Sequence, residues 1–292
     1  MTLEVIRVLA PNPSIATLEG TNTWVVGDDP TIVIDPGPAI DEHLAEVARA
    51  AKRVAHVLVT HDHEDHAAGA AAFARLVGAD VVAWRIPEVA KMHDGERFVA
   101  GGVELIALHT PGHSADHVVF SEAGSGALFT GDAVLGRGTS FIDEPDGDLA
   151  RYLTSLRKML ERRPRTIYPG HGPVVLDAEA KLRAYLEHRA DREEQILTGL
   201  AAGDRTVDAL VQRIYADHPA DVHELAARSV TAHLLKLESE GRVSKAGRVA
   251  ERTWTTVEPR ACARCGRTVK GRARYCGSCS LALLQGDAAG SG

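Results

Sequence analysis

The segment Thr60-His-Asp-His-Glu-Asp-His66 decides the fold of this 292-residue chain. It follows an apolar, β-branched run that predicts a strand, and the carboxyl ends of strands are where α/β proteins place their sites. His61 and His63 alternate along the chain, so both can point to one position. Asp65 and His66, in the next turn or at the start of a helix, can point to a second. Imidazole and carboxylate suit Zn²⁺, Mn²⁺ or Fe²⁺, so the segment predicts a metal site.

Four ligands in one loop cannot complete two metal spheres, and three later strand-to-loop junctions offer the rest. His113 lies in Thr110-Pro-Gly-His-Ser, Asp132 in Phe129-Thr-Gly-Asp, and His171 in Tyr168-Pro-Gly-His-Gly. Each follows glycine, which permits the sharp turn that presents a side chain inward. With the first segment they form a set of seven candidate ligands.

Short β-prone runs and helical patterns alternate over the first 170 residues. Turn residues separate the runs, which predicts strands; the predicted strands are Asn22–Val26, Thr31–Ile34, His56–Thr60, Val81–Trp84, Val103–Leu108, Val118–Phe120 and Ala127–Phe129. Apolar residues at helical spacing predict helices at Ile40–Lys52, Ala67–Val77 and Asp148–Leu160. This pattern indicates an α/β fold with buried sheets covered by helices.

The pattern changes after Pro173. A long helix is predicted over Asp177–Leu200, then one capped by Thr206 and one over residues 221–240. Two β-prone runs follow, Arg242–Ser244 and Arg252–Val257. Helix, helix and two-stranded wing is the order of a winged-helix module. A helical cap that only braces the larger domain is the alternative.

The four cysteines form two C-x-x-C pairs, Cys262/Cys265 and Cys276/Cys279. This spacing predicts a Cys₄ ribbon around one structural Zn²⁺, with two disulfides as the alternative. Six Lys and Arg residues and Tyr275 accompany the cysteines, which suits single-stranded nucleic acid. A protein partner fits nearly as well.

Charge and composition limit the classes of function. The chain is 45% hydrophobic and 25% charged, as in globular proteins, and its net charge is −7. Residues 1–180 carry a net −11 and residues 259–292 a net +5, so the body is acidic and the tail basic. We expect no membrane segment and no secretory signal, which makes the cytoplasm the expected location.

The seven candidate ligands resemble those of the metallo-β-lactamase superfamily. That resemblance implies a four-layer αββα sandwich with the metal site at one edge of its two sheets. It implies that His61, His63 and His113 hold the first metal, that Asp65, His66 and His171 hold the second, and that Asp132 bridges both. Every position of the pattern is filled.

Further segments are similar to the β-lactamase-like-protein-2 branch of this superfamily. They are Leu18–Gly27, Ile34–Gly37, Pro111–His117, Tyr168–Pro173, and the stretch from His188 to about Ser244. The best-understood members of that branch are endoribonucleases acting on single-stranded RNA, and fungal relatives release polyketides by thioester hydrolysis. The cysteine tail departs from the pattern of the branch.

The resemblance predicts a dinuclear hydrolase, with two Zn²⁺ (or Mn²⁺ or Fe²⁺) and a metal-bridging hydroxide as nucleophile. Asp65 and Asp132 are the expected catalytic carboxylates. Asp35 and His117 are candidates to orient the ligands, with ordinary structural roles as the alternative. Asn22 is a candidate substrate contact.

The leading functional hypothesis is an endoribonuclease that acts on single-stranded RNA. A thioester hydrolase on a small molecule, of the glyoxalase II or acyl-thioesterase kind, is the second. A nucleic-acid or protein adaptor with a vestigial metal site is the third. The expected domains are a catalytic domain (1–175), a helical linker with winged helix (176–258), a zinc ribbon (259–282) and a disordered tail (283–292).

Overall fold

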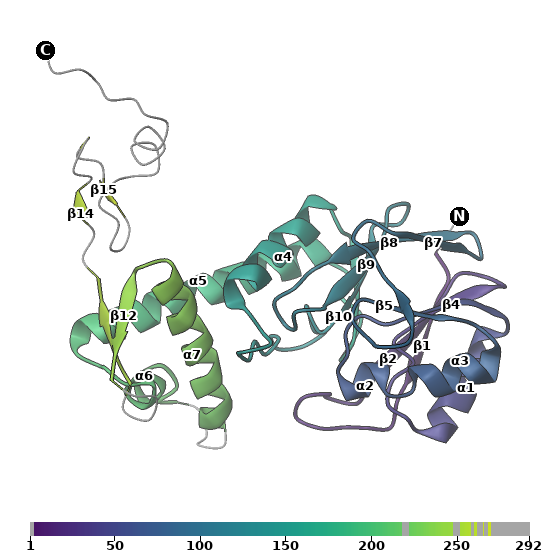
Figure 1. Cartoon of the computed structure of the whole chain (residues 1–292), viewed down its shortest axis with the longest axis horizontal. Coiled ribbons are helices and arrows are strands. Elements are labelled where there is room, and N and C mark those ends of the chain that lie inside the picture. The colour runs from purple at the N-terminus through teal and green to yellow at the C-terminus, as the bar shows by residue number, and fades with distance from the viewer. Residues whose placement is uncertain are drawn as a thin grey trace, which may run out of the picture. The chain divides into compact units, whose positions relative to one another are not determined.

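A computed structural model describes residues 3–217, 222–247, 252–257, 260–261, 265 and 268–269. The chain divides into two compact units, Met1–His188 (the first unit) and Arg189–Gly292 (the second unit). The first unit contains two β-sheets with helices against them, and the second contains helices and a hairpin (Figure 1).

The first sheet has six strands in sequential order. Its first three strands pair antiparallel and its last three continue in parallel. The strands are β1 (Val5–Leu9), β2 (Asn22–Val26), β3 (Thr31–Ile34), β4 (Val54–Leu58), β5 (Val81–Ala83) and β6 (Ala90–Lys91). Because β3, β4 and β5 run parallel, their carboxyl ends meet at one edge, where the loop of residues 59–63 begins.

The second sheet has five strands in the order β11-β10-β9-β8-β7. All its pairs are antiparallel except β10 with β11. The strands are β7 (Arg97–Ala100), β8 (Val103–His109), β9 (Val118–Glu122), β10 (Ala127–Gly131) and β11 (Thr166–Pro169). The loops that follow β8, β10 and β11 carry the later candidate ligands.

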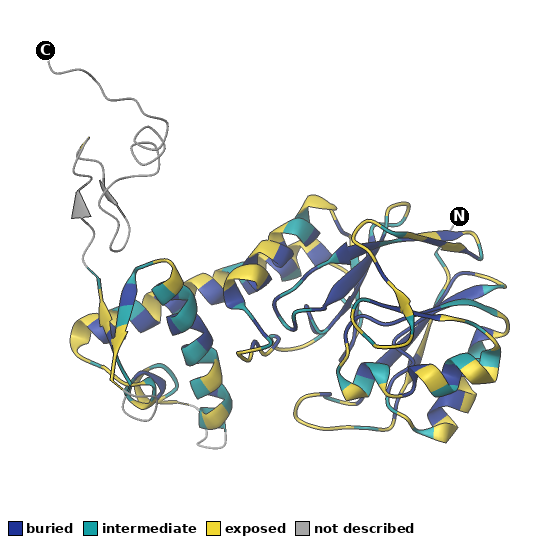
Figure 2. Ribbon diagram, viewed as in Figure 1, coloured by how far each residue is buried: buried dark blue, intermediate teal, exposed yellow. Residues whose placement is uncertain are grey.

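The two sheets pack face to face, and alternation along the strands explains why strands such as β2, β3 and β10 are buried throughout. Trp24 and Ile34 of the first sheet belong to one apolar cluster with Phe120 and Phe129 of the second. Neighbouring residues such as Val33 point to the other face and join a second cluster, with α1 (Asp41–Ala51) and α3 (Ala70–Val77). Figure 2 shows the resulting burial along the strands and the exposed outer faces of these helices.

Helix α4 (Leu149–Glu161) lies against the second sheet's loops and supplies the layer opposite α1 and α3. The Tyr152 hydroxyl donates to the carbonyl of Ala133, after β10, and the Ser155 hydroxyl donates to that of Pro111, after β8. This confirms the predicted αββα sandwich.

One predicted helix was wrong in its extent. The pattern predicted a continuous helix over Ala67–Val77, but the structure has α2 (Glu64–Ala67) and then α3, interrupted at Gly69. A Cβ at Gly69 would lie 2.9 Å from the carbonyl oxygen of Gly37, and the Gly69 N–H donates to that same oxygen. The close approach of another loop therefore breaks the helix.

The second unit contains the carboxyl-terminal part of α5 (Ala178–Ala202), then α6 (Val207–Ile214), α7 (His223–Ser239), and the antiparallel hairpin of β12 (Val243–Ala246) and β13 (Thr253–Thr256). Thr206 caps α6 as predicted, accepting from the N–H of Ala209. Leu200, Leu210, Leu234 and Trp254 belong to its apolar core. The helix, helix and wing order predicted from the sequence is present.

Little of the predicted ribbon falls within the described residues. β14 (Arg260–Ala261) pairs antiparallel with β15 (Thr268–Val269), and Cys265 is exposed. Cys262, Cys276 and Cys279, and the tail predicted over residues 283–292, lie outside them. Among the helices that are described, none has the length and apolar character needed to cross a membrane.

Candidate metal centre

The seven predicted ligands come from loops that follow four strands. The loop after β4 supplies His61 and His63, and the short helix α2 begins at Glu64, so Asp65 and His66 lie in its single turn. His113 follows β8, Asp132 follows β10 and His171 follows β11. All seven are brought together in the first unit.

The ligands form two groups of side chains. In the first group, one ligand atom from each of His61, His63, His113 and Asp132 lies within 4.8 Å of the others. In the second group, the same holds for Asp65, His66 and His171. The division is the one implied by the resemblance, because the alternate residues of the first segment go to one group and the residues on α2 to the other.

Asp132 lies between the two groups and turns one carboxylate oxygen toward each. Its Oδ2 is 3.7 Å from Nε2 of His113, in the first group. Its Oδ1 is 3.3 Å from Nε2 of His66 and 3.2 Å from Nε2 of His171, in the second group. Asp65 belongs only to the second group, with its Oδ2 3.1 Å from Nε2 of His171. This is the arrangement that a bridging carboxylate requires.

Hydrogen bonds at Nδ1 orient four of the histidine rings. The Nδ1–H of His66 donates to Asp35 Oδ2 at 2.8 Å, that of His113 to the carbonyl of Phe141 at 2.9 Å, and that of His171 to the carbonyl of Gly20 at 3.2 Å. Nδ1 of His61 lies 3.0 Å from the Thr60 hydroxyl, which itself donates to Asp35. Because Nδ1 is engaged by these contacts, each ring turns its Nε2 toward the cluster.

Ionisation in the centre follows from these contacts. Burial alone would lower the pKa of His66, but the carboxylates of Asp132 and Asp35 outweigh burial and raise it well above its usual value. The pKa of His171 rises to about 9 because Asp132 and Asp65 likewise outweigh burial. Burial opposes ionisation of Asp132, yet His66 and His171 hold its pKa well below normal. The second group therefore stabilises positive charge.

His61 behaves in the opposite way. Burial lowers its pKa well below normal, and the neighbouring imidazoles add to the effect. Its Nε2 is buried without a hydrogen-bond partner among the described residues. A buried, unprotonated nitrogen that faces three other ligand atoms fits a divalent cation, and imidazole with carboxylate is the donor set that Zn²⁺, Mn²⁺ and Fe²⁺ accept.

Asp35 and His117, the candidates for orienting ligands, both contact the loops of the centre. Asp35 is buried and accepts from the Thr60 N–H at 2.7 Å in addition to His66. His117 is fully buried and accepts from the backbone N–H of Asp132 at 3.2 Å, while its Nδ1 faces the Thr110 hydroxyl. Each therefore holds the position of a ligand.

The predicted substrate contact at Asn22 was wrong. Its side chain is fully buried, and Nδ2 donates to the carbonyls of Pro169 and Gly172, each at 2.9 Å. These carbonyls flank His171 in the chain. Asn22 therefore fixes the loop that presents His171, and its side chain is closed to solvent.

An open pocket of about 380 Å³ leads to the ligands. The apolar side chains of Ala16, Leu135 and Phe141 line one part of it, and Phe141 is 40% exposed. The segment Asp143-Glu-Pro-Asp146 gives it an acidic rim, which the sequence reasoning missed because no metal-ligand spacing marks that loop. Arg85 forms ion pairs with Asp146 of the rim and with Asp62 of the ligand loop.

The fold and the ligand cluster define a metal-binding hydrolase of the metallo-beta-lactamase superfamily, and the chain belongs to that superfamily. The sequence model of the metallo-beta-lactamase superfamily matches residues 16–83 and 77–171. The model of the beta-lactamase associated winged helix domain matches residues 206–254. The fold of this superfamily implies binding of divalent metal ions. Among curated proteins, the chain is 36% identical to the beta-lactamase-like protein 2 homolog of Drosophila melanogaster, over 84% of this chain and 92% of the relative.

Other relatives show how widely the fold is used. The chain is 35% identical to the atrochrysone carboxyl ACP thioesterase of Claviceps purpurea, over 88% of this chain and 87% of that enzyme. A crystal structure of a metallo-beta-lactamase family protein from Thermus thermophilus matches with a TM-score of 0.69 and 22% identity, over 87% of this chain and 98% of that one. The structural match shows the shared fold.

Proposed function

We propose that this hydrolase uses two divalent cations to cleave single-stranded RNA. The observation that carries the dinuclear assignment is the position of Asp132, which turns one oxygen toward each ligand group. His61, His63 and His113 would hold one cation, and Asp65, His66 and His171 the other. The cations, when bound, supply a water of lowered pKa and positive charge for the oxygen that becomes negative in the transition state.

Residues of the chain hold the metal ligands in position and set the charge of the site. Asp35 and the carbonyls of Gly20 and Phe141 fix the histidine rings, so the ligands need little rearrangement to bind. The buried threonine at position 60 joins Asp35 to His61. Asp65 and Asp132 carry two negative charges against four positive charges on two cations, so the loaded site attracts an anionic phosphodiester.

The choice of RNA is supported by the similarity to the β-lactamase-like-protein-2 branch over both units. The acidic rim, Asp143 to Asp146, repels a polyanion. A strand would therefore be held by the cations and by positive side chains outside the rim.

A paired assay tests this proposal. The purified metal-loaded protein is incubated with a labelled single-stranded RNA and, separately, with an acyl thioester, each with and without a chelator and with metal added back. We expect RNA cleavage that the chelator removes and added metal restores. Thioester hydrolysis alone would replace the proposal with the second candidate, and no hydrolysis by the fully loaded protein would favour an adaptor.

Thioester hydrolysis is the second candidate because the pocket has an apolar part. Ala16, Leu135 and Phe141 offer a surface for an acyl chain, and the relatives named as acyl-carrier thioesterases match most of this chain. A water activated by the two cations would serve as nucleophile toward a thioester carbonyl or a phosphorus atom, so the ligand set fits either substrate.

We also propose that the metals are zinc and that the tail binds a third zinc ion through its four cysteines. Neutral imidazole and carboxylate suit zinc in the centre, and four thiolates suit a structural site. We expect about three zinc equivalents per chain by elemental analysis and about two for Cys276→Ser, with cleavage of a very short oligonucleotide retained. About two equivalents in both proteins would remove the third site.

A further inference from the structure

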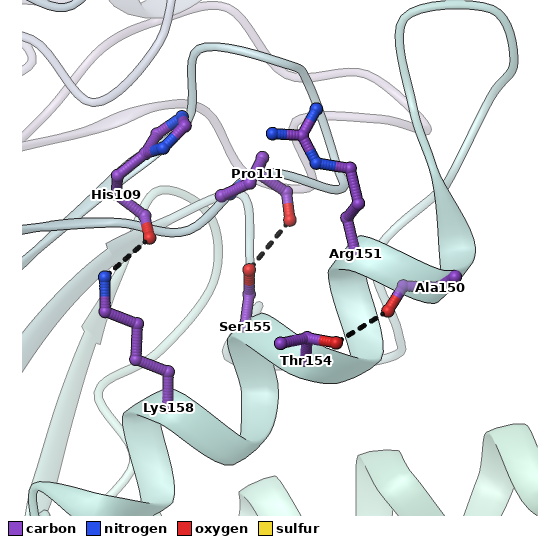
Figure 3. A pocket seen from close by; sticks show the side chains of 7 residues that line it. All are labelled: His109, Pro111, Ala150, Arg151, Thr154, Ser155 and Lys158. Atoms are coloured by element: carbon purple, nitrogen blue, oxygen red, sulfur yellow. Dashed lines mark hydrogen bonds between the residues drawn. The ribbon is translucent and has the colours of Figure 1, made fainter. Parts of the chain in front are cut away.

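A second pocket lies beside the metal centre, between α4 and the segment that follows β8. It has a volume of about 400 Å³ and is open to solvent. Figure 3 shows the side chains that line it, from His109 and Pro111 on one side and from α4 on the other. The residues of α4 are Ala150, Arg151, Thr154, Ser155 and Lys158. None of the lining residues is acidic.

Two cations of this pocket retain capacity to bind an anion. The Arg151 side chain is exposed and forms no ion pair with any described residue. Lys158 donates to Asp94 Oδ1 at 2.9 Å and to the His109 carbonyl at 3.0 Å, which uses two of its three N–H groups. The pocket therefore has one positive charge without an ion-pair partner among the described residues, on Arg151, beside the Lys158–Asp94 ion pair, in a body whose net charge is negative.

His109, which lines the pocket, belongs to an aromatic pair. The rings of Trp84 and His109 are stacked, with centroids 3.8 Å apart and planes inclined by 9°. Both residues are only partly buried. A partly exposed aromatic ring beside cationic side chains is the combination that binds single-stranded nucleic acid, because a base stacks on the ring while the charge of the backbone is neutralised.

The pocket is tied to a metal ligand through α4. Ser155 donates to the carbonyl of Pro111, and the N–H of Asp148 donates to that of Gly112 at 2.9 Å. A Cβ at Gly112 would lie 2.3 Å from Cα of Tyr152, so the helix packs directly on the residue before His113. Pro111 lines the pocket, and its Cα is within about 7 Å of that of His113 by chain length alone.

We propose that this pocket binds a backbone phosphate of the RNA strand that flanks the scissile phosphate. Arg151 is the principal contact, since a guanidinium can donate two parallel hydrogen bonds to one phosphate, and Lys158 adds a second charge. The flanking base stacks at Trp84 and His109. The assignment rests on the proposed RNA cleavage, and it explains how an enzyme with an acidic rim holds a polyanion.

Binding of a cleavage-resistant, 2′-O-methyl oligonucleotide to the metal-loaded protein tests the proposal. We expect Arg151→Gln to weaken binding about tenfold and to reduce the slope of log affinity against log salt by about one. Arg157→Gln is the matched control, because Arg157 is exposed on another face of α4 and donates to the carbonyl of Leu153. The control should bind as the unaltered protein does.

Single methylphosphonate linkages, which remove one phosphate charge, locate the contact. In the unaltered protein a neutral linkage at the pocket-bound position should weaken binding about tenfold. In Arg151→Gln the same linkage should cause no further loss of affinity. Equal affinities and salt slopes for the unaltered protein and for Arg151→Gln/Lys158→Gln would overturn the proposal while leaving RNA cleavage intact. The proposal would also be overturned if a methylphosphonate linkage weakened binding equally at every position of the oligonucleotide in both proteins.

Failure of the proposed function gives a different result. If the unaltered protein neither binds nor cleaves RNA but hydrolyses thioesters, the assignment to an RNA strand is overturned. A comparison of acyl-coenzyme A with the phosphate-free acyl-pantetheine then identifies the source of the phosphate. A loss in kcat/KM on Arg151→Gln confined to the coenzyme A substrate would assign the pocket to a small phosphorylated substrate.

Discussion

Charged side chains are buried in both units, in the metal centre of the first and around Glu193 in the second. Glu193 is 8% exposed and is neutralised by Lys236 and by Arg242, whose Nη1 lies 3.1 Å away. In the metal centre, by contrast, imidazole nitrogens and carboxylate oxygens from seven side chains face one another. The charge of Glu193 is balanced by side chains of the protein itself, whereas the ligands of the metal centre need bound cations.

This difference distinguishes buried charges that stabilise the fold, such as Glu193, from buried charges that bind a ligand, such as those of the metal centre. A buried charge that is paired within the chain affects mainly stability when it is altered. A buried set of acceptors that converge on common points affects ligand binding and chemistry. The following substitutions test this separation.

The largest effect should come from Asp132→Ala. The substitution removes the carboxylate that faces both ligand groups, so neither cation keeps its full set of ligands. We expect the rate of hydrolysis to fall by at least about a thousandfold. Rate measurements on the metal-loaded proteins check this, with the exposed Asp80→Ala as control. A variant that kept a tenth of the activity would exclude a bridging role for Asp132.

A smaller effect, on metal affinity, is expected for Asp35→Asn. Asparagine keeps the shape of the side chain but loses the negative charge that holds His66 and Thr60. We expect metal affinity to fall by about 10- to 100-fold. Competition with a fluorescent chelator measures it, with Asp80→Asn alongside. Unchanged affinity would mean that Asp35 only stabilises the loop.

Glu193→Gln should change stability and leave the chemistry alone. It leaves Lys236 and Arg242 without their buried partner, and Arg242 is partly exposed, so we expect a loss of about 1–3 kcal/mol in the free energy of unfolding. Urea denaturation checks this against Glu194→Gln, an exposed neighbour. Loss of activity in the folded variant would contradict the separation of roles.

The smallest effect is expected for Lys245→Gln. Its side chain is 39% exposed and that of its partner Glu238 is 29% exposed, so water already solvates both charges. We expect a change of less than about 0.5 kcal/mol in the same denaturation experiment. A loss as large as that of Glu193→Gln would show that exposure does not distinguish the two pairs.

Local sequence features predicted most of the fold and the ligands of the site. The β-branched runs gave strands such as β2 and β3 with their observed ends, since these residues fill buried faces on both sides of a sheet. The seven ligands were predictable because each follows a strand or a glycine turn. β1, β6, β7 and β11 were missed. All four are edge strands, and exposed residues in β1, β6 and β7 weaken the apolar pattern.

What the sequence could not predict depends on contacts between distant segments. The break in the helix at Gly69 is caused by Gly37, and the burial of Asn22 is caused by the loop that carries His171. The pairing of Arg85 with two acidic loops and the pocket beside α4 also join segments that are far apart in the chain. No local pattern of residues encodes such contacts.

Phe141 combines two roles on different atoms. Its backbone carbonyl accepts from His113 and orients that ligand, while its side chain lines the mouth of the pocket. Every amino acid has the same carbonyl, so the side chain at this position can change during evolution without disturbing the metal ligand. The lineage can therefore acquire new substrates by replacing Phe141 while inheriting an unaltered catalytic centre.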